Sequence, residues 1–230
     1  MTIVQPELIA ILAALILVLI PPVPIDVPAP PAIFSISGVI CGTSWRSFAV
    51  RLFLEVDEQL GPVTALVNNA GTVGLKSRVD ELTDLRIMHT LKTNVLGPIL
   101  CAKHAVLRMS PRYGGQGGNI VNVSSVAARL GSPGEYVDYA ASKGALDTFT
   151  LGLSKELAGE GIRVNAVRPG YIFTDFHALS GDPGRVSKLE PIIPMGRGGR
   201  PEEVAEAIVW LLSDKASYTT GTFLDLGGGR

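Results

Sequence analysis

Residues 1–45 carry almost no charge. Only Glu7 and Asp26 are charged there, although the whole chain has 20 basic and 21 acidic residues. The net charge of -1 at pH 7 provides no basic surface of the kind that binds nucleic acid or an anionic membrane. We therefore expect no nucleic-acid partner, and we expect the N-terminal segment to differ in kind from the rest of the chain.

Cysteine is also scarce. Cys41 and Cys101 are the only two in the sequence, and neither lies in a Cys-x-x-Cys or Cys/His pattern. This excludes a disulfide framework and a structural zinc site, and it indicates a reducing, cytoplasmic compartment. The 47% of apolar residues and the 26 glycines exclude a disordered chain and suit a glycine-rich α/β fold.

The N-terminal segment combines an apolar run at residues 8–20 with a proline cluster at residues 21–31. The run is shorter than the about 20 residues that cross a bilayer. It also lacks the preceding basic residues and the small-residue cleavage site of a secretory signal. We expect a buried or disordered head rather than a membrane anchor, and we divide the chain into an atypical head (1–49) and a main region (50–230).

The main region alternates short β-rich runs with long amphipathic stretches, which is typical of βαβ units. This predicts an α/β fold built on a doubly wound parallel sheet. Strands are expected at 64–68, 119–124, 163–167 and 222–226, and helices at 83–109, 137–159 and 201–213.

Two of the predicted strands run into turn motifs that could meet a ligand, since ligands of open parallel sheets lie at the carboxyl ends of the strands. The first motif is Asn-Asn-Ala-Gly, at residues 68–71. The second is Pro169-Gly170, which is followed by Ile172 and Thr174. Each motif taken alone is equally compatible with a plain strand-to-loop turn.

Tyr139 and Lys143 form the sharpest chemical pattern. Residues four apart lie on one face of a helix, so the lysine ammonium is expected near the tyrosine phenol. An adjacent positive charge favours the phenolate and lowers its pKa toward the working pH. The pair is therefore a candidate for proton transfer, although a solvated helix face is the alternative when the pair is considered alone.

In combination, these motifs resemble the short-chain dehydrogenase/reductase family. The order is Asn-Asn-Ala-Gly, Asn94, Ser125, Tyr-x-x-x-Lys and Pro-Gly-x-Ile-x-Thr, and it extends from about residue 50 to the end of the chain. Residues 118–143 look closest to a bacterial subgroup labelled glucose or sugar dehydrogenase-like. The resemblance implies a Rossmann-like fold, NAD or NADP as cofactor, and a small alcohol or carbonyl compound as substrate.

The resemblance also implies roles for individual residues. Tyr139 would be the general acid or base, and Lys143 would lower its pKa and bind the nicotinamide ribose. Ser125 would hold the substrate oxygen, and Asn94 would anchor a water of the proton relay. Ser125 is one residue further from Tyr139 than is usual in the family, which leaves Ser124 as an alternative. Cofactor contacts are expected from Asn68, Ala70, Gly71, Tyr139, Lys143, Pro169, Gly170, Ile172 and Thr174.

The head departs from the family pattern. Family members begin with a strand and a Thr-Gly-x-x-x-Gly-x-Gly loop that binds the pyrophosphate. Residues 37–44 imitate this loop, but too few residues separate Gly38 from Asn68 for the missing strands and their helices. We therefore expect incomplete N-terminal strands, a foreign or out-of-frame head and weak binding of dinucleotide. The edge of strand 64–68 would be exposed unless the apolar head covers it.

The leading interpretation is an NAD(P)-dependent oxidoreductase that interconverts an alcohol and a carbonyl. The alternative is a catalytically impaired fragment or binding protein that cannot hold dinucleotide, and a membrane-anchored protein is a third reading. Substrate would contact loops near residues 129–138 and 175–195, the second of which contains His177. We also expect a homodimer or homotetramer, because the helices that carry Asn94 and Tyr139 include several apolar residues. These residues are Leu100, Ala105, Leu146, Phe149 and Leu153.

Overall fold

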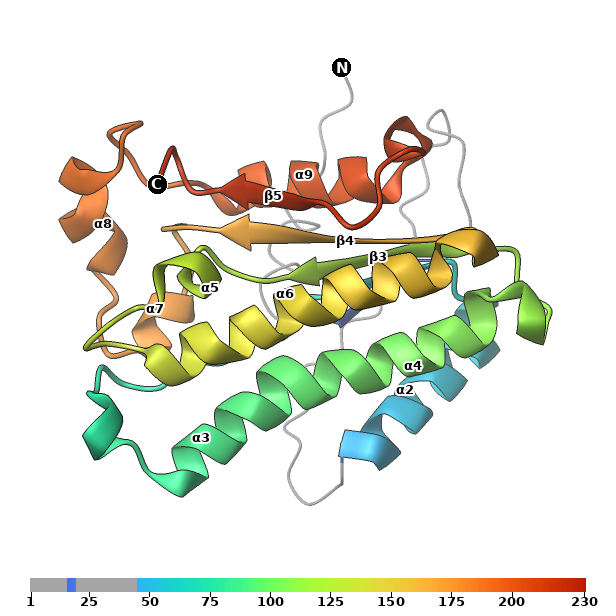
Figure 1. Cartoon of the computed structure of the whole chain (residues 1–230), viewed down its shortest axis with the longest axis horizontal. Coiled ribbons are helices and arrows are strands. Elements are labelled where there is room, and N and C mark those ends of the chain that lie inside the picture. The colour runs from blue at the N-terminus through green and yellow to red at the C-terminus, as the bar shows by residue number, and fades with distance from the viewer. Residues whose placement is uncertain (1–15, 20–44) are drawn as a thin grey trace.

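The computed structural model of the chain describes residues 16–19 and 45–230 (Figure 1). Within them, five strands form one sheet in the order β1-β2-β3-β4-β5. The strands are β1 (Ile16–Leu19), β2 (Ala65–Asn68), β3 (Gly118–Val123), β4 (Ile162–Pro169) and β5 (Phe223–Leu226). Strands β2 to β5 pair in parallel, whereas β1 pairs antiparallel with β2.

Helices precede and connect the parallel strands. They are α2 (Trp45–Leu60), α3 (Asp84–Leu91), α4 (Gly97–Met109), α5 (Ala127–Leu130), α6 (Val137–Leu157), α7 (Phe176–Leu179), α8 (Arg185–Leu189) and α9 (Pro201–Leu212). Short 3-10 turns lie at Val79–Glu81, Pro111–Tyr113, Ala158–Glu160, Glu190–Ile192 and Asp214–Ala216. A π-helical turn, η3 (Lys92–Leu96), joins α3 to α4, so the helix expected at 83–109 is one helical stretch with a change of winding at Asn94. The predicted α/β class with a parallel sheet is confirmed.

The head contributes the edge strand of the described sheet. Ile16 pairs with Asn68 and Leu19 with Ala65, so part of the apolar run covers the edge of β2. The rest of that run and the imitation loop at 37–44 lie outside the described residues. Among the residues that the structure describes, no helix is long and apolar enough to cross a membrane. The division into a head and a main region stays a prediction.

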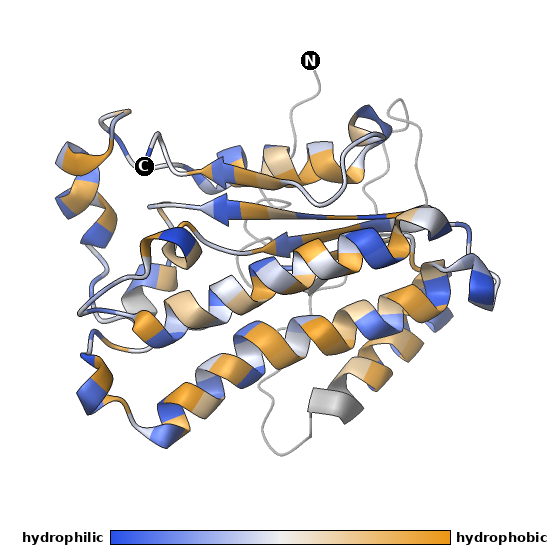
Figure 2. Ribbon diagram, in the orientation of Figure 1, coloured by the Kyte–Doolittle hydropathy of each residue, from blue (hydrophilic) through white to orange (hydrophobic). Residues whose placement is uncertain are grey.

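The sheet has a core on each face, because successive side chains of a strand point to opposite sides. Leu66, Ile120 and Val164 pack against α2 and α4 in the larger apolar cluster. Val67, Val121 and Val167 pack against α9 through a smaller one. Figure 2 shows apolar stretches recurring along α4 and α9, as amphipathic helices require.

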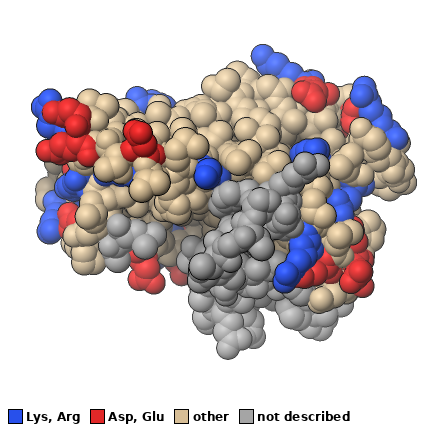
Figure 3. All heavy atoms as spheres, turned by 90° about the horizontal axis from the view of Figure 1, so that it is seen from below, with Lys and Arg blue, Asp and Glu red and all other residues tan. Residues whose placement is uncertain are grey.

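The argument for self-association needs correction. Ala105 and Leu146 are fully buried within the single chain, and Leu100, Phe149 and Leu153 are half-buried against the same core. Ala105 and Leu146 therefore do not belong to an outer surface, whereas Leu100, Phe149 and Leu153 each keep part of the side chain exposed. Other apolar side chains of α3 and α4 are exposed, among them Leu85, Met88 and Ile99. Figure 3 views the molecule from below, where most of the visible charged side chains gather toward the two ends and isolated basic groups lie between them.

Candidate active site

Two serines follow β3 at the carboxyl edge of the sheet, and only one of them meets Tyr139. The Ser125 hydroxyl accepts a hydrogen bond from the backbone N–H of Ala127 at 3.1 Å and hydrogen-bonds with the Tyr139 side chain. The Ser124 hydroxyl instead donates to the backbone carbonyl of Lys143 at 3.3 Å. Of the two alternatives that the sequence left open, Ser125 is the one beside the phenol.

Lys143 lies one helical turn after Tyr139 on α6. Its Nζ is 5.8 Å from the centre of the Tyr139 ring and donates to the backbone carbonyl of Val123 at 2.7 Å. The side chain is buried, although it carries an ammonium group. The structure therefore brings the hydroxyls of Ser125 and Tyr139 and the Lys143 amine together where β3 ends and α6 begins.

The pKa values of Tyr139 and Lys143 differ from what the sequence led us to expect. Burial raises the pKa of Tyr139 to about 12, and the hydrogen bond with Ser125 opposes that rise. Burial lowers the pKa of Lys143 to about 8, against the pull of the Asp147 carboxylate. We expected the ammonium to lower the phenol pKa toward the working pH, and this is wrong for the structure as it stands. Desolvation penalises the charged form of each group, and the opposing contributions come from Ser125 for the phenol and from Asp147 for the amine.

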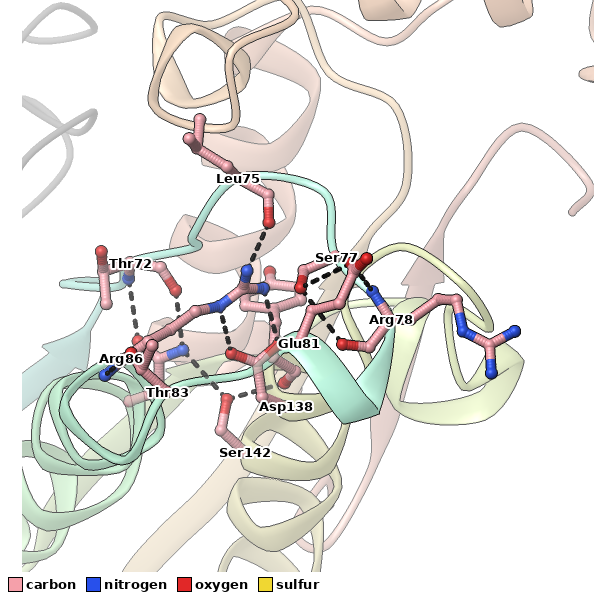
Figure 4. Close-up of polar contacts among 11 residues, drawn as sticks. Thr72, Leu75, Ser77, Arg78, Glu81, Thr83, Arg86, Asp138 and Ser142 are labelled. Carbon is pink, nitrogen blue, oxygen red and sulfur yellow. Dashed lines mark hydrogen bonds and ion pairs between the residues drawn. The ribbon is translucent and has the colours of Figure 1, made fainter.

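Asn94 is buried in the π-helical turn and bridges two segments. Its Oδ1 accepts from the Thr72 N–H at 2.8 Å, and its Nδ2 donates to the Thr72 carbonyl and the Ser142 hydroxyl, each at 2.9 Å. Thr72 and Ser142 are labelled in Figure 4. A Cβ added to Gly71 would lie 3.5 Å from Lys143 Nζ and 3.7 Å from Asn94 Oδ1. Gly71, Asn94 and Lys143 therefore share one corner of the site.

Asn68 does not join that corner. Its Nδ2 donates to Asn122 Oδ1 at 2.8 Å, and Asn122 Nδ2 donates in turn to the Thr150 hydroxyl at 2.8 Å. Thr150 donates to the Leu146 carbonyl at 2.8 Å, which completes a buried polar ladder from the sheet to α6. The Asn68 side chain is thus engaged inside the protein, whereas the backbone after it leads into the half-buried Ala70.

The second turn motif follows β4, which ends at Pro169. A Cβ on Gly170 would come within 2.8 Å of Gly227 Cα, so close approach of the two backbones accounts for the glycine. Ile172 is buried and forms an isolated parallel bridge with Gly199, and Thr174 is half-buried. The plain turn reading therefore explains Gly170, while Ile172 and Thr174 lead toward α7.

An aromatic neighbour of Tyr139 could not be assigned from the sequence. The Phe176 ring in α7 lies 5.9 Å from the Tyr139 ring, and His177 meets Phe176 edge-on at 6.2 Å. Burial lowers the pKa of His177, and the Arg185 charge adds to that effect. The expected substrate loop at 175–195 thus reaches the phenol through Phe176, and the only sequence signal was its place after the second turn motif.

An ion-pair cluster joins three loops beside α6. Glu135 accepts from Arg185 in a bidentate pair and from Lys76 at 2.9 Å, and Lys76 also reaches Asp182 at 4.0 Å. The hydrogen bond with Arg185 lowers the pKa of Glu135 to about 2. The cluster links the loop after β2, the loop before α6 and residues 182–185, which lead into α8.

Comparison with known proteins places this chain among oxidoreductases. A family model described as "Enoyl-(Acyl carrier protein) reductase" matches residues 41–230. The chain is 61% identical over 181 residues to a protein of Escherichia coli (strain K12) named "Uncharacterized oxidoreductase YgfF", which covers 79% of this chain and 73% of that protein. It is 40% identical over 172 residues to the "Glucose and ribitol dehydrogenase homolog" of Oryza sativa subsp. japonica, which covers 74% of this chain and 57% of the rice protein.

A solved structure is similar as well. The crystal structure of a short-chain type dehydrogenase/reductase from Mycobacterium marinum matches with a TM-score of 0.74 and 32% sequence identity. The match covers 80% of this chain and 71% of that one. The chain spans less than two thirds of the rice relative and more than two thirds of the other two proteins.

Proposed function

The chain belongs to the short-chain dehydrogenase/reductase family of oxidoreductases, and from this premise we propose that it interconverts a small alcohol and its carbonyl compound with NAD or NADP. The observation that carries the proposal is the convergence of Ser125, Tyr139 and Lys143 at the carboxyl edge of β3. A hydroxyl pair with a buried amine beside it is suited to hold a carbonyl oxygen and to exchange a proton with it.

The nicotinamide half of a dinucleotide fits the residues present. Lys143 has three N–H donors, and among the described residues it donates to one acceptor, the Val123 carbonyl. It therefore has donors to offer the ribose hydroxyls. Bound NAD(P) would supply or accept the hydride. Further contacts would come from Ala70 and Gly71 on one side and from Pro169, Gly170, Ile172 and Thr174 on the other.

The chain's own residues would handle the proton. Tyr139 is protonated at neutral pH because its pKa is about 12, so it is ready to donate to a substrate oxygen during reduction. Ser125 would hold that oxygen beside the phenol. The Lys143 charge would favour the phenolate left behind. Asn94 would support the proton path to Lys143 by fixing the loop at Thr72.

Substitution of Tyr139 by Phe tests this proposal. The variant removes the proton while keeping the ring, and kcat should fall by about 10²–10⁴-fold. Tyr113→Phe is a matched control, because Tyr113 is exposed in the turn after α4, away from the site. Activity would be screened on sugars, other alcohols, aldehydes and ketones with NAD(H) and NADP(H). Equal turnover by wild type and Tyr139→Phe would refute the role of the phenol.

A second candidate function is supported by the direction of β1. Because β1 is antiparallel to β2, the chain leaves it at the amino edge of the sheet, opposite to Tyr139. A phosphate-binding turn needs to follow a strand at the carboxyl edge. This favours a protein that keeps the proton-transfer residues and holds dinucleotide poorly. Titration with NADH and NADPH separates the two: a micromolar Kd supports the first candidate, and no saturation at millimolar concentration supports the second.

The setting of the protein is part of the same proposal. A reducing, cytoplasmic compartment suits the free thiol of Cys101, which is buried on α4 and whose pKa burial raises to about 12. A homodimer or homotetramer would cover exposed apolar side chains of α3 and α4, such as Leu85 and Met88.

A further inference from the structure

Arg86 of α3 and Asp138 of α6 form a bidentate ion pair beside the candidate site. Arg86 Nε donates to Asp138 Oδ2 at 2.9 Å, and Nη2 donates to Oδ1 at 3.0 Å. Only 4% of the Asp138 side chain and 18% of the Arg86 side chain are exposed. Asp138 immediately precedes Tyr139 in the first turn of α6, so the ion pair anchors to α3 the helical turn that carries the phenol (Figure 4).

The same guanidinium also holds the loop that follows β2. Arg86 Nη1 donates to the Leu75 carbonyl at 2.5 Å. A Cβ on Gly74 would lie 2.6 Å from Arg86 Nε, so a larger residue there would displace the Arg86 side chain from its present position against the loop. One arginine thus joins three segments, namely α3, the loop at 72–77 and the first turn of α6.

Other contacts fix the same loop and turn from either side. The Ser77 N–H donates to the Glu135 carbonyl at 3.0 Å, one residue before the N-cap of α6. Ser142 donates to the Tyr139 carbonyl at 2.7 Å and accepts from Asn94, which in turn holds Thr72. Arg86 and Asp138 are the charged members of this network and the ones that reach across from α3 to α6.

We propose that Arg86 and Asp138 are positioning residues that hold the Tyr139 phenol in register with the Ser125 hydroxyl. The role given to Tyr139 rests on the proposed function, but the geometry does not. A buried ion pair adds little net stability compared with apolar side chains of the same size, whereas it enforces a specific geometry between the segments it joins. A displacement of about 1 Å at a reacting group can cost on the order of 100-fold in rate.

The chain offers a matched control. Arg108 of α4 holds Asp57 of α2 with contacts of 2.8 Å, 2.8 Å and 2.5 Å, and it is about as exposed as Arg86. This pair also joins two helices, but it lies away from α6. Arg86→Gln and Asp138→Asn break the first pair, and Arg108→Gln breaks the second. Arg86→Lys keeps the charge but cannot form the fork to Asp138 and the bond to Leu75 at once.

The primary readout needs neither cofactor nor turnover. Protein labelled with ¹³C at the tyrosine ring is studied by NMR, and the Tyr139 resonance is assigned by its loss in Tyr139→Phe. We expect Arg86→Gln and Asp138→Asn to shift or broaden this resonance, Arg86→Lys to have a smaller effect, and Arg108→Gln to have none. The charge-exchanged double variant, Arg86→Asp with Asp138→Arg, should restore part of the wild-type signal.

Kinetics provide the second readout if the proposed function holds. Arg86→Gln should lower kcat by about tenfold or more and change the KM for dinucleotide by less than about twofold, because the ribose contacts of Lys143 are untouched. If no variant or wild type turns over, the proposed function fails and the NMR comparison still decides the positioning role. If Asp138→Asn does not fold, Arg86→Lys carries the test. A wild-type Tyr139 resonance in folded Arg86→Gln or Arg86→Lys protein would overturn the proposal.

Discussion

The two halves of one sheet face differ in chemistry although they belong to the same strands. On the face covered by α2, α4 and α6, the amino halves of β2 and β3 present Leu66 and Ile120, and the carboxyl halves present Asn68 and Asn122. The first pair lies in the apolar core, and the second starts the polar ladder that leads to Thr150. The amino half therefore supplies stability, whereas the carboxyl half supplies fixed geometry next to Tyr139 and Lys143.

The largest effect on stability should come from the apolar half. Phe53 of α2 is completely buried in the larger cluster, so Phe53→Ala removes contacts and leaves a cavity. We expect the free energy of unfolding to fall by about 3–5 kcal/mol. Urea denaturation measures this loss. The kinetic constants of the remaining folded protein should stay close to wild type, and a large drop in its kcat would show that the two halves are not separable.

Loss of the polar ladder should lower the free energy of unfolding by less than Phe53→Ala does. Asn122→Ala removes one partner each from the Nδ2 of Asn68, which keeps a 3.4 Å bond to the Pro98 carbonyl, and from the hydroxyl of Thr150, which keeps its bond to the Leu146 carbonyl. We expect a loss of about 1–3 kcal/mol, the range typical of a buried hydrogen-bond partner removed. The same denaturation experiment applies, with Thr150→Val as a milder variant. A stabilised Asn122→Ala protein would contradict the role of the ladder.

Removal of the buried amine should act in the opposite direction. The pKa of Lys143 is about 8 in the folded chain against 10.5 unfolded, so the unfolded chain binds this proton more tightly. Lys143→Met should therefore raise the free energy of unfolding by about 1–3 kcal/mol at pH 7, after allowance for the lost bond to the Val123 carbonyl. The gain should shrink as the pH rises from about 8 to 10.5, because the wild type then loses the Lys143 proton and no longer buries a charge. A gain independent of pH would mean that burial of the charge is not its source.

The smallest effect on the folding of one chain is expected on the outer face of α3. Leu85 is 84% exposed, so Leu85→Lys should change the stability of the monomer by less than about 0.5 kcal/mol. If this face pairs two copies, the same change, combined with Met88→Lys, should shift the light-scattering mass toward the monomer. An unchanged mass would move the interface elsewhere, and a monomeric wild type would remove it.

The sequence predicted the parts of the site whose residues lie close along the chain. Tyr139 and Lys143 are four residues apart on one helix, and the apolar runs before Asn68 and Ser124 mark buried strands. Arg86 and Asp138 escaped notice because each is an ordinary charged residue on a helix surface, and only the packing of α3 against α6 makes them partners. The direction of the phenol's pKa was wrong for a similar reason, since burial depends on Phe176 and other neighbours that no local pattern reveals.

The head shows the same limit. Its apolar composition was compatible with covering the edge of β2, and β1 does lie there. Its antiparallel direction could not be read, because a four-residue apolar strand pairs equally well either way until the chain that flanks it is placed.

The π-helical turn at Lys92–Leu96 makes the helical stretch behave as if it carried one inserted residue. An α-helix of the same span with one residue fewer would turn either Asn94 away from Thr72 or the core residues Cys101 and Ala105 of α4 away from the sheet. The extra residue lets both alignments coexist, since it rotates everything after it by about one α-helical step of 100°. The number of residues in this segment therefore matters more than their identity. Many substitutions at Lys92 or Thr93 should preserve the π-helical turn, whereas deletion of a single residue should break either the bridge from Asn94 to Thr72 or the packing of α4 on the core.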